Sequence, residues 1–399
     1  MTRSLSDRGF ALLLAALSSL APFSIDTYLP SFPDIAEKLG ATQLQVHQTL
    51  SAYLIPFAAM ALVQGAIADA VGRRRVTLWA LGLFALASAG CAFATRIEHL
   101  WLLRAAQGIS AGAGIVIGRA IVRDLYDGPA ARRMMSHVTI TFALAPVIAP
   151  VIGGWLHIWF GWRSVFVFLT ALSSIIWFVL WRWLPETLPP EERRSLHPVY
   201  LLVAYRRVLS TPIFLAATTA QACNFSGFFI YVLSAPVFLM THLGVSEAEF
   251  IWLFGPAMGG LMLGSWLSGR LASRLSPLQC IVCGYAVMAV ASFFNLAISH
   301  LLLPGLPWSV LPLSVYTAGM AFAGSALTLL ALDPFSSKRG LAASCQTFLQ
   351  FGANGLVAGL LAPMLWSSPQ TMAAGMAGFA ALGLLVTLLY VHRRLHLII

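Results

Sequence analysis

The fold is decided by a pattern that is clearest at residues 46–95, VHQTLSAYLIPFAAMALVQGAIADAVGRRRVTLWALGLFALASAGCAFAT. Two runs of about twenty mostly apolar residues flank a turn that carries Asp69, Arg73, Arg74 and Arg75. A helix of about twenty residues is about 30 Å long, which is the thickness of the hydrocarbon core of a bilayer. Neither run shows the period-2 alternation of a membrane β-strand. The pattern therefore predicts two membrane-spanning helices joined by a short charged turn.

The same pattern recurs along the whole chain of 399 residues, of which 59% are hydrophobic and 10% are charged. Soluble domains carry about 25% charged residues, so this composition excludes a soluble fold. We therefore predict an all-α integral membrane protein. Its twelve transmembrane helices are expected at residues 9–29, 46–68, 76–95, 100–122, 137–160, 164–183, 213–239, 250–272, 277–299, 310–331, 341–363 and 371–391.

The longest polar stretch, residues 184–211, follows the sixth predicted helix and holds four prolines and a run of charges. It divides the chain into an N-terminal half at residues 1–183 and a C-terminal half at residues 212–399, with six helices in each. Many transporters are built from two such repeats, related by an axis along the membrane normal. The spacing therefore predicts two six-helix halves joined by a cytoplasmic linker.

The positive charges separate by side of the membrane. With both termini in the cytoplasm, 20 of the 24 Lys and Arg residues fall in cytoplasmic segments, and only Lys38, Arg96 and Arg163 fall on the opposite face. Cytoplasmic loops carry such an excess, so we expect a multi-pass protein of the bacterial inner membrane with both termini cytoplasmic. The same loops account for the net charge of +10. No basic stripe is interleaved with aromatic residues, so nucleic acid is not an expected partner.

Histidine and cysteine give no sign of a metal centre. The nine histidines are scattered without ligand spacing, and the five cysteines lie within or at the edges of apolar runs. We expect no metal, no disulfide framework and no cofactor, with a proton gradient as the source of energy.

Only one carboxylate, that of Asp26, lies plainly inside a predicted span. An ionisable group in hydrocarbon is costly and is by default a hypothesis for a functional site. Ser18, Pro22 and Asp26 recur every four residues and so share one polar face of the helix. We predict that Asp26 carries a proton and contacts the substrate. The alternative is that its side chain only extends to the outer surface.

Arg104 is the only cation inside a predicted span, and Gln107 lies one turn further along the same side of its helix. Counting about 1.5 Å per residue from the helix ends places Arg104 in the same depth layer as Asp26. A nearby guanidinium favours an ionised carboxylate, whereas a low dielectric favours a neutral one. This competition predicts that Asp26 and Arg104 form a proton-coupling site. A fixed structural ion pair is the alternative.

Polar and aromatic side chains near the predicted midplane are candidates for the substrate pocket. Together with Asp26 they are Tyr53, Gln107, Asn224, Tyr231, Tyr316, Gln350 and Asn354. Each could instead make a hydrogen bond between helices or anchor an interface. A pocket with so few charges favours uncharged or singly cationic substrates.

Three short motifs resemble those of a known family. Residues 65–75, GAIADAVGRRR, resemble the signature G-x-L-a-D-r-x-G-r-k of the major facilitator superfamily, with Ala70 in place of the usual basic residue. Residues 104–108, RAAQG, resemble the second motif of the superfamily. Residues 145–154, APVIAPVIGG, are similar to the G-x-x-x-G-P-x-x-G-G of its drug–proton antiporters, with alanine at two glycine positions.

Two further segments are similar to one branch of these antiporters. They are residues 26–33, DTYLPSFP, and residues 161–163, GWR, which resemble exporters of the bicyclomycin-resistance (Bcr/CflA) type. The resemblance covers the whole chain. It implies two six-helix halves and the export of small hydrophobic drugs, such as phenicols or bicyclomycin-like compounds, in exchange for protons by alternating access. Multidrug efflux and antibiotic resistance would follow.

The resemblance also implies roles for the matching residues. Gly65, Asp69, Gly72 and Arg73 would belong to a cytoplasmic gate that locks the two halves in the outward-facing state. An interface motif would allow close approach of helices and consists of Pro150, Gly153 and Gly154. A fitting partner across the two halves would be the eighth span with its small residues Gly255, Gly259, Gly260 and Gly264.

Other functions remain open on the same residues. The nearest rival is a carrier of this fold for a metabolite such as a sugar, a nucleoside or an amino acid. An integral membrane enzyme would need paired acidic residues or a metal cluster near the surface, and a channel would need a filter-like repeat, neither of which the sequence offers. We expect no enzymatic activity, a monomer in the lipid bilayer, and a small-molecule drug and protons as partners.

Overall fold

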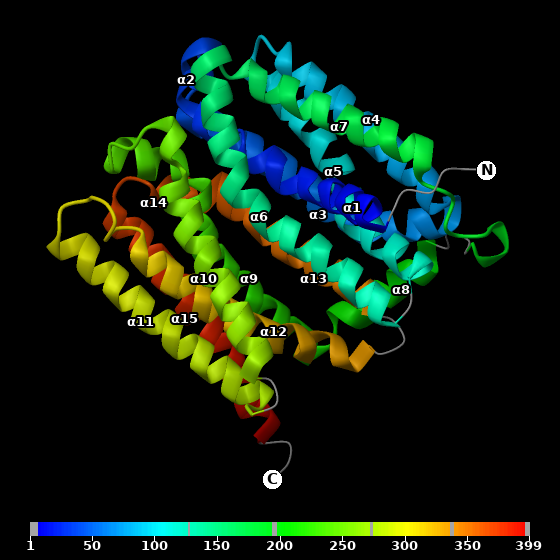
Figure 1. The fold of residues 1–399 in the computed structure, drawn as a ribbon. Helices are drawn as coiled ribbons and strands as arrows, with labels where there is room; N and C mark the ends of the chain where they lie inside the picture. The colour runs from blue at the N-terminus through cyan, green and yellow to red at the C-terminus, as the bar shows by residue number, and fades with distance from the viewer. Residues whose placement is uncertain (1–6, 127, 194–197, 272–273, 336–338, 396–399) are drawn as a thin grey trace. The chain divides into compact units, whose positions relative to one another are not determined.

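The computed structural model describes residues 7–126, 128–193, 198–271, 274–335 and 339–395. The chain forms two compact units, an N-terminal unit from Met1 to Pro198 and a C-terminal unit from Val199 to Ile399 (Figure 1). The division between them falls inside the polar stretch 184–211. No strand occurs among the described residues, so the prediction of an all-helical fold is confirmed.

The N-terminal unit is a bundle around a central helix, α5, which packs against α1, α3, α4 and α6. The turns between its helices are fixed locally. Thr42 begins α3 with a capping box, in which its hydroxyl accepts from Gln45 N and the Gln45 side chain accepts from Thr42 N. The helices are α1 (Asp7–Asp26), α2 (Phe32–Leu39), α3 (Gln43–Val71), α4 (Arg73–Ala92), α5 (Ile97–Leu125), α6 (Gly128–Phe160) and α7 (Arg163–Trp183).

The C-terminal unit is a second bundle, in which α12 packs against α9, α10 and α11. Ser276 begins α11 with a capping box like that of α3, and proline at the first helical position begins both α9 and α11. The helices are α8 (Pro198–Leu209), α9 (Pro212–Leu233), α10 (Ile251–Leu271), α11 (Pro277–Leu301), α12 (Leu311–Leu332), α13 (Arg339–Leu356), α14 (Ala362–Leu365) and α15 (Pro369–Leu395).

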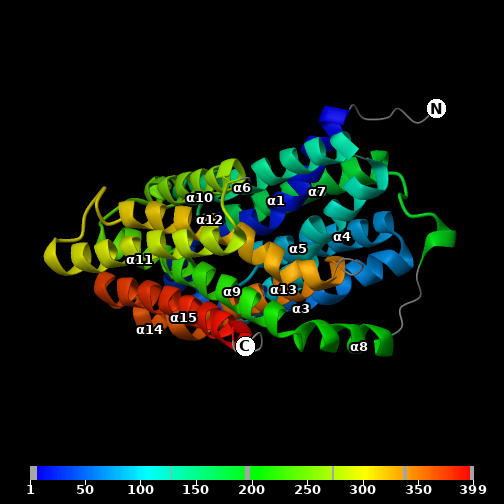
Figure 2. The same ribbon diagram turned by 90° about the horizontal axis from the view of Figure 1, so that it is seen from below.

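The two units repeat one pattern of neighbours. In the N-terminal unit α5 contacts α1, α3 and α4, and in the C-terminal unit α12 contacts their counterparts α9, α10 and α11. In the N-terminal unit, α7 packs against α4 and α1 (Figure 1). In the C-terminal unit, its counterpart α15 packs in the same way against α11 and α9 (Figure 2). Each unit therefore has the same six-helix topology, as a chain built from an internal repeat requires.

Most of these helices are long and apolar enough to cross a bilayer. The described residues contain eleven such helices, and a shorter apolar stretch, Leu144–Phe160, belongs to α6. The fifth predicted span, residues 137–160, lies within α6, and its first side chains lie outside those that the structure describes. The prediction of a multi-pass helical membrane protein is confirmed.

Three predicted spans include or end in an irregular segment, and in each case a proline lies within that segment or just after it. The first predicted span ran to Leu29, but α1 ends at Asp26 and a 3-10 turn, Leu29–Ser31, leads into α2. The seventh and eleventh spans contain π-helical turns, Pro236–His242 and Val357–Leu361. Proline lacks the N–H that continues an α-helix, so Pro30, Pro236 and Pro363 displace the regular hydrogen-bond pattern.

Glycines let the helices of each unit approach one another closely. A Cβ at Gly153 of α6 would collide with the carbonyl oxygen of Thr27. A Cβ at Gly260 or Gly264 of α10 would collide with backbone carbonyls of α12. Gly260 and Gly264 are therefore used in close packing inside the C-terminal unit. Contact of the α10 glycines with the other half stays a prediction.

Candidate functional site

Arg104 of α5 is fully buried in the N-terminal unit, and its guanidinium is held by three hydrogen bonds. Its Nη1 donates to the carbonyl oxygen of Ser24 at 3.0 Å, to Ser24 Oγ at 2.8 Å and to Gln107 Oε1 at 2.8 Å. The guanidinium carbon also lies 4.9 Å from the ring centroid of Tyr28 and 4.5 Å from that of Tyr53. Cation–π attraction of this kind is strongest where water is excluded, so Arg104 is fixed between the two rings.

Two predicted substrate residues take part in this arrangement. Gln107 accepts from Arg104 and donates from Nε2 to Ser88 Oγ at 2.7 Å. Tyr53 stacks on the guanidinium, and its hydroxyl lies 3.4 Å from the carbonyl oxygen of Ala21. Both side chains are fully buried. In this structure they therefore organise the surroundings of Arg104 inside the unit.

Asp26 is the last residue of α1 and only 4% of its surface is exposed. Among the described residues its carboxylate makes no hydrogen bond and no ion pair. Arg104 contacts Ser24, which lies two residues before Asp26 on α1. Arg104 and Asp26 do not form the fixed ion pair that was the alternative prediction. The Nε and Nη2 atoms of Arg104 are likewise buried without a hydrogen-bond partner. The guanidinium of Arg104 therefore does not neutralise the carboxyl group of Asp26 through a direct contact.

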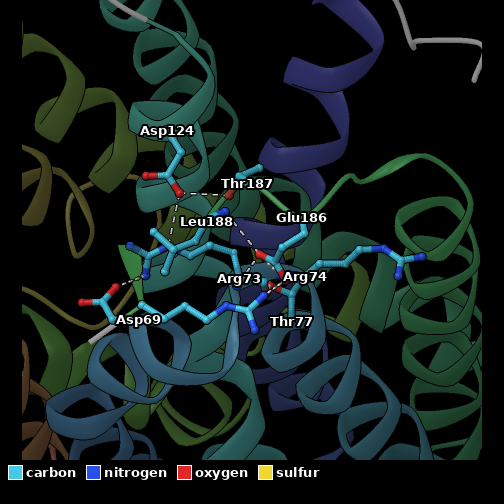
Figure 3. Close-up of polar contacts among 9 residues, drawn as sticks. Asp69, Arg73, Arg74, Thr77, Asp124, Glu186, Thr187 and Leu188 are labelled. Carbon is cyan, nitrogen blue, oxygen red and sulfur yellow. Dashed lines mark hydrogen bonds and ion pairs between the residues drawn. The ribbon is translucent and has the colours of Figure 1, made fainter. Parts of the chain in front are cut away.

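The charged turn between α3 and α4 forms a second polar cluster in the same unit (Figure 3). Asp69 and Arg73 form an ion pair one helical turn apart, and Arg73 Nε also donates to Asp124 Oδ2 at 3.2 Å. Thr187 Oγ1 donates to the same Asp124 oxygen at 2.9 Å. The cluster thus joins the ends of α3, α4 and α5 to the segment after α7.

Glu186 completes this cluster by capping the first turn of α4. Its Oε1 accepts from the backbone N–H of Arg73 at 2.8 Å and of Arg74 at 3.4 Å. A carboxylate at a helix N-terminus is favoured by the free N–H groups and by the helix dipole. Gly72 makes the approach possible, because it has φ +115 and a Cβ there would meet Glu186 Oε2. Gly65, at the other end of the motif, lies on α3. A Cβ at Gly65 would lie 3.4 Å from Cγ1 of Val116 on α5.

Sequence reasoning missed Asp124, Glu186 and Thr187. Asp124 is 51 positions from Arg73, and Glu186 is 113 positions from it. Asp124 lies in the last turn of α5, and Glu186 and Thr187 follow shortly after the end of α7. Of the motif predicted to mediate close packing, Pro150, Gly153 and Gly154 are all buried in α6, and Gly153 lies against the backbone that follows Asp26.

Several predicted pocket residues of the C-terminal unit are used in bonds between helices. Tyr316 donates to the carbonyl oxygen of Asn224 at 3.0 Å, and Asn224 Nδ2 donates to Tyr285 at 3.1 Å. Asn354 Oδ1 accepts from Ser226 at 3.2 Å, and Tyr231 accepts from Asn295 at 2.7 Å. The amide of Asn224 faces α15, because a Cβ at Gly383 would lie 2.5 Å from its Oδ1. For these residues the alternative, a hydrogen bond between helices, describes the structure.

A cavity of about 590 Å³ inside the C-terminal unit is lined by both Gln350 and Asn224. Gln350 differs from Asn224 because its side chain makes no hydrogen bond within the described part of the chain. The cavity is formed by α9, α10, α12 and α13 and by the start of α11. The sequence analysis did not select most of its polar groups, since hydroxyl and amide side chains on apolar helices give no distinctive spacing. These missed residues are Gln221, Ser265, Ser268, Ser325 and Thr328.

Two topologically equivalent bundles of apolar helices, with a charged turn and buried ionisable groups in one of them, define a two-repeat membrane transporter. The family can be stated more narrowly. Residues 14–358 match the profile of the Major Facilitator Superfamily, and the chain belongs to this family. The resemblance of its motifs to this superfamily is therefore confirmed.

Named relatives are similar over most of the chain. It is 29% identical over 384 residues to the "Multidrug resistance protein D" of Escherichia coli, covering 95% of this chain and 92% of that protein. It is 28% identical over 266 residues to the "Bicyclomycin resistance protein homolog" of Haemophilus influenzae, covering 67% of each. The crystal structure of a "D-xylose-proton symporter" has a TM-score of 0.73 at 15% identity, covering 94% of this chain and 97% of that one, which is a likeness of fold.

Proposed function

We propose that this protein is a proton-coupled antiporter of the bacterial inner membrane that exports small hydrophobic drugs by alternating access. The names of its relatives support drug export. One observation in the structure supports the coupling to protons: Asp26 is a buried carboxyl group at the end of α1 without a bonding partner among the described residues.

Burying a charge away from water is costly. An ionised carboxylate in a dry interior without a partner costs several kcal/mol, so the buried arrangement suits a carboxyl group that has taken up a proton. Losing the proton then requires access to water. A transporter that exposes Asp26 alternately to the two sides would carry one proton inward for each cycle.

The energy available from this exchange is sufficient for export. A proton that moves down a potential of about 150 mV releases about 3.5 kcal/mol. At about 1.4 kcal/mol per factor of ten, this supports a gradient of a neutral solute of about a few hundredfold. One proton per cycle is therefore enough for the proposed function.

The cluster around Arg73 is the proposed cytoplasmic gate. Arg73 is held by Asp69 and Asp124, and the first turn of α4 is capped by Glu186. These contacts make the turn rigid, so that it can present Asp69, whose side chain is 40% exposed, to a partner. Loss of that contact would favour the state in which the cytoplasmic side is open.

One observation favours a second candidate function, a carrier for a neutral polar metabolite. The cavity of the C-terminal unit offers two glutamine side chains and several hydroxyl groups, more than the sequence analysis anticipated. A metabolite carrier would bind a metabolite in this cavity, whereas a drug exporter would bind a drug there. Competition by sugars, nucleosides or amino acids against a drug separates the two.

The proposal is tested with the purified protein in liposomes. Vesicles that are acidic inside should accumulate external radiolabelled chloramphenicol above its equilibrium level, because protons leave as the drug enters. Vesicles at equal pH on both sides should only equilibrate. Accumulation that is the same with and without the pH gradient would contradict proton coupling, and accumulation of a metabolite in place of every drug tested would favour the second candidate.

A further inference from the structure

We infer that the cavity of the C-terminal unit is a binding subsite for neutral drugs that carry both an apolar body and hydrogen-bonding groups. The inference rests on the proposed function for its physiological meaning, but ligand binding can be measured without transport. It assigns a role to residues that neither the motifs nor the charged clusters involve, above all Gln350 and Gln221.

The size and position of the cavity suit such a ligand. Its volume of about 590 Å³ lies within the range of about 300 to 1,000 Å³ that is typical of pockets for drug-sized molecules. It extends from Pro277 at the start of α11 to Gln350, which lies eleven residues into α13 and hence about 16 Å along that helix. Under the expected topology both helices begin at the cytoplasmic face, so a drug would enter this cavity from the cytoplasm.

The lining selects for neutral molecules. None of the described residues around the cavity is charged, and apolar contact area comes from Phe225, Met320 and Leu261 among others. A charged ligand would lose its hydration there without meeting an opposite charge, which costs more than hydrogen bonds to amides return. A neutral ligand with a ring and a few polar groups loses little and buries its apolar surface.

The polar groups of the cavity are of two kinds. Gln221 is held in place, because it donates to Thr328 at 3.1 Å and accepts from Gln346 at 2.5 Å. Gln350, in contrast, makes no hydrogen bond from its side chain within the described part of the chain. Its amide offers two donors and one acceptor group to a ligand, and it is the polar side chain that a bound molecule would satisfy.

Two glycines leave the cavity open. A Cβ at Gly324 of α12 would meet only Gln221 Nε2, at 3.8 Å, and a Cβ at Gly269 of α10 would meet nothing within 4 Å. A side chain added at Gly324 therefore extends into the space proposed for the ligand and not into a neighbouring helix. Because leucine favours a helix more than glycine does, the change is compatible with folding of α12.

Binding of radiolabelled chloramphenicol to the purified, detergent-solubilised protein tests the inference by equilibrium dialysis. Gln350→Leu keeps the volume of the side chain but removes its hydrogen bonds, and should weaken binding about three- to tenfold. Gly324→Leu should weaken binding at least about tenfold by occupying the space. The matched controls are Gln43→Leu at the exposed start of α3 and Gly378→Leu in α15, where a Cβ meets nothing within 4 Å. Both should bind as the wild type does.

Two native cysteines report the position of the ligand. Cys280 lines the cavity, whereas Cys283, three residues further along α11, is exposed and does not. Chloramphenicol should slow the alkylation of Cys280 and leave that of Cys283 unchanged, as mass spectrometry of the labelled peptides can measure. Equal alkylation of Cys280 with and without a bound drug would overturn the location of the subsite.

The outcomes separate this inference from the proposed function. Binding that is lost in Gly324→Leu and Gln350→Leu supports the subsite even if the wild type exports no drug, which would contradict only the proposed function. Wild-type affinity in both variants overturns the subsite and leaves drug export in place. Failure of the wild-type protein to bind chloramphenicol also overturns the assignment of neutral drugs to this cavity.

Discussion

The guanidinium of Arg104 donates a hydrogen bond of 3.0 Å to the backbone carbonyl oxygen of Ser24, two residues before Asp26. A buried cation thus holds the end of α1 by its backbone and its Ser24 hydroxyl. Within the described ranges of the chain, the carboxyl group of Asp26 has no ion pair. Because the contact is to the backbone, it does not depend on whether Asp26 is ionised. Arg104 can therefore position the end of α1 throughout the proposed proton cycle.

Replacement of Arg104 by lysine should destabilise the N-terminal unit. A lysine ammonium lacks the planar fork that reaches Ser24 and Gln107 together, so buried acceptors lose their partner at a cost of about 2–4 kcal/mol. Thermal unfolding in detergent should show a lower midpoint for Arg104→Lys. Arg96→Lys is the control, because that side chain is 71% exposed. Equal midpoints for Arg104→Lys and the wild type would refute the role of these bonds.

Replacement of Gly153 by alanine should displace α6 from the end of α1. The added Cβ would collide with the carbonyl oxygen of Thr27, which is backbone and cannot rotate away. We expect a lower yield of folded protein and a lower unfolding temperature. Gly378→Ala adds the same group in open space and should behave as the wild type does. A Gly153→Ala protein with wild-type stability would show that α6 and α1 do not approach this closely.

The sequence predicted what depends on short spacing and missed what depends on tertiary contact. Arg104 and Gln107 are three positions apart on one helix, so their meeting follows from helical geometry. The charged turn likewise brought Asp69 and Arg73 together. Glu186 and Asp124 are joined to that turn only by the packing of α5 and α7, and the pair Gln221–Thr328 is separated by 107 positions. No local pattern encodes such distances.

The cavity illustrates the same limit. Gln350 was chosen because it is polar and near the middle of a predicted helix, and so were Asn224, Tyr316 and Asn354. The structure gives the last three residues hydrogen bonds to neighbouring helices and, within the part of the chain that it describes, gives the Gln350 side chain none. Of those three, only Asn224 also lines the cavity. Which face of a helix is turned toward a cavity depends on the packing of four other helices, so it cannot be deduced from composition.

Replacement of Asp69 by asparagine should shift the balance of states with little effect on stability. Its side chain is 40% exposed, and an exposed ion pair contributes at most about 1 kcal/mol. If Asp69 belongs to the proposed gate, the variant should favour the state that is open to the cytoplasm. Distances between spin labels on the cytoplasmic ends of α3 and α10 should lengthen on average. Unchanged distances together with lost transport would assign Asp69 a different role.

The orientation in the membrane can be tested by cysteine labelling. Ser210 follows α8 and Ser367 precedes α15, and both are exposed. In a cysteine-free background and intact cells, Ser367→Cys should react with an impermeant thiol reagent, whereas Ser210→Cys should react only after the membrane is permeabilised. The reverse pattern would invert the proposed topology and move the Asp69 cluster to the outer face.

The central claim is that Asp26 carries the proton, and Asp26→Asn in liposomes tests it most directly. Asparagine resembles a permanently protonated carboxyl group, so vesicles that are acidic inside should no longer accumulate chloramphenicol. Exchange of labelled for unlabelled drug should persist, because exchange moves no net proton, and drug affinity should no longer vary with pH in the neutral range. Asp34→Asn, a substitution in the short helix α2, should accumulate the drug normally. Accumulation of chloramphenicol by Asp26→Asn at the wild-type level would contradict the account.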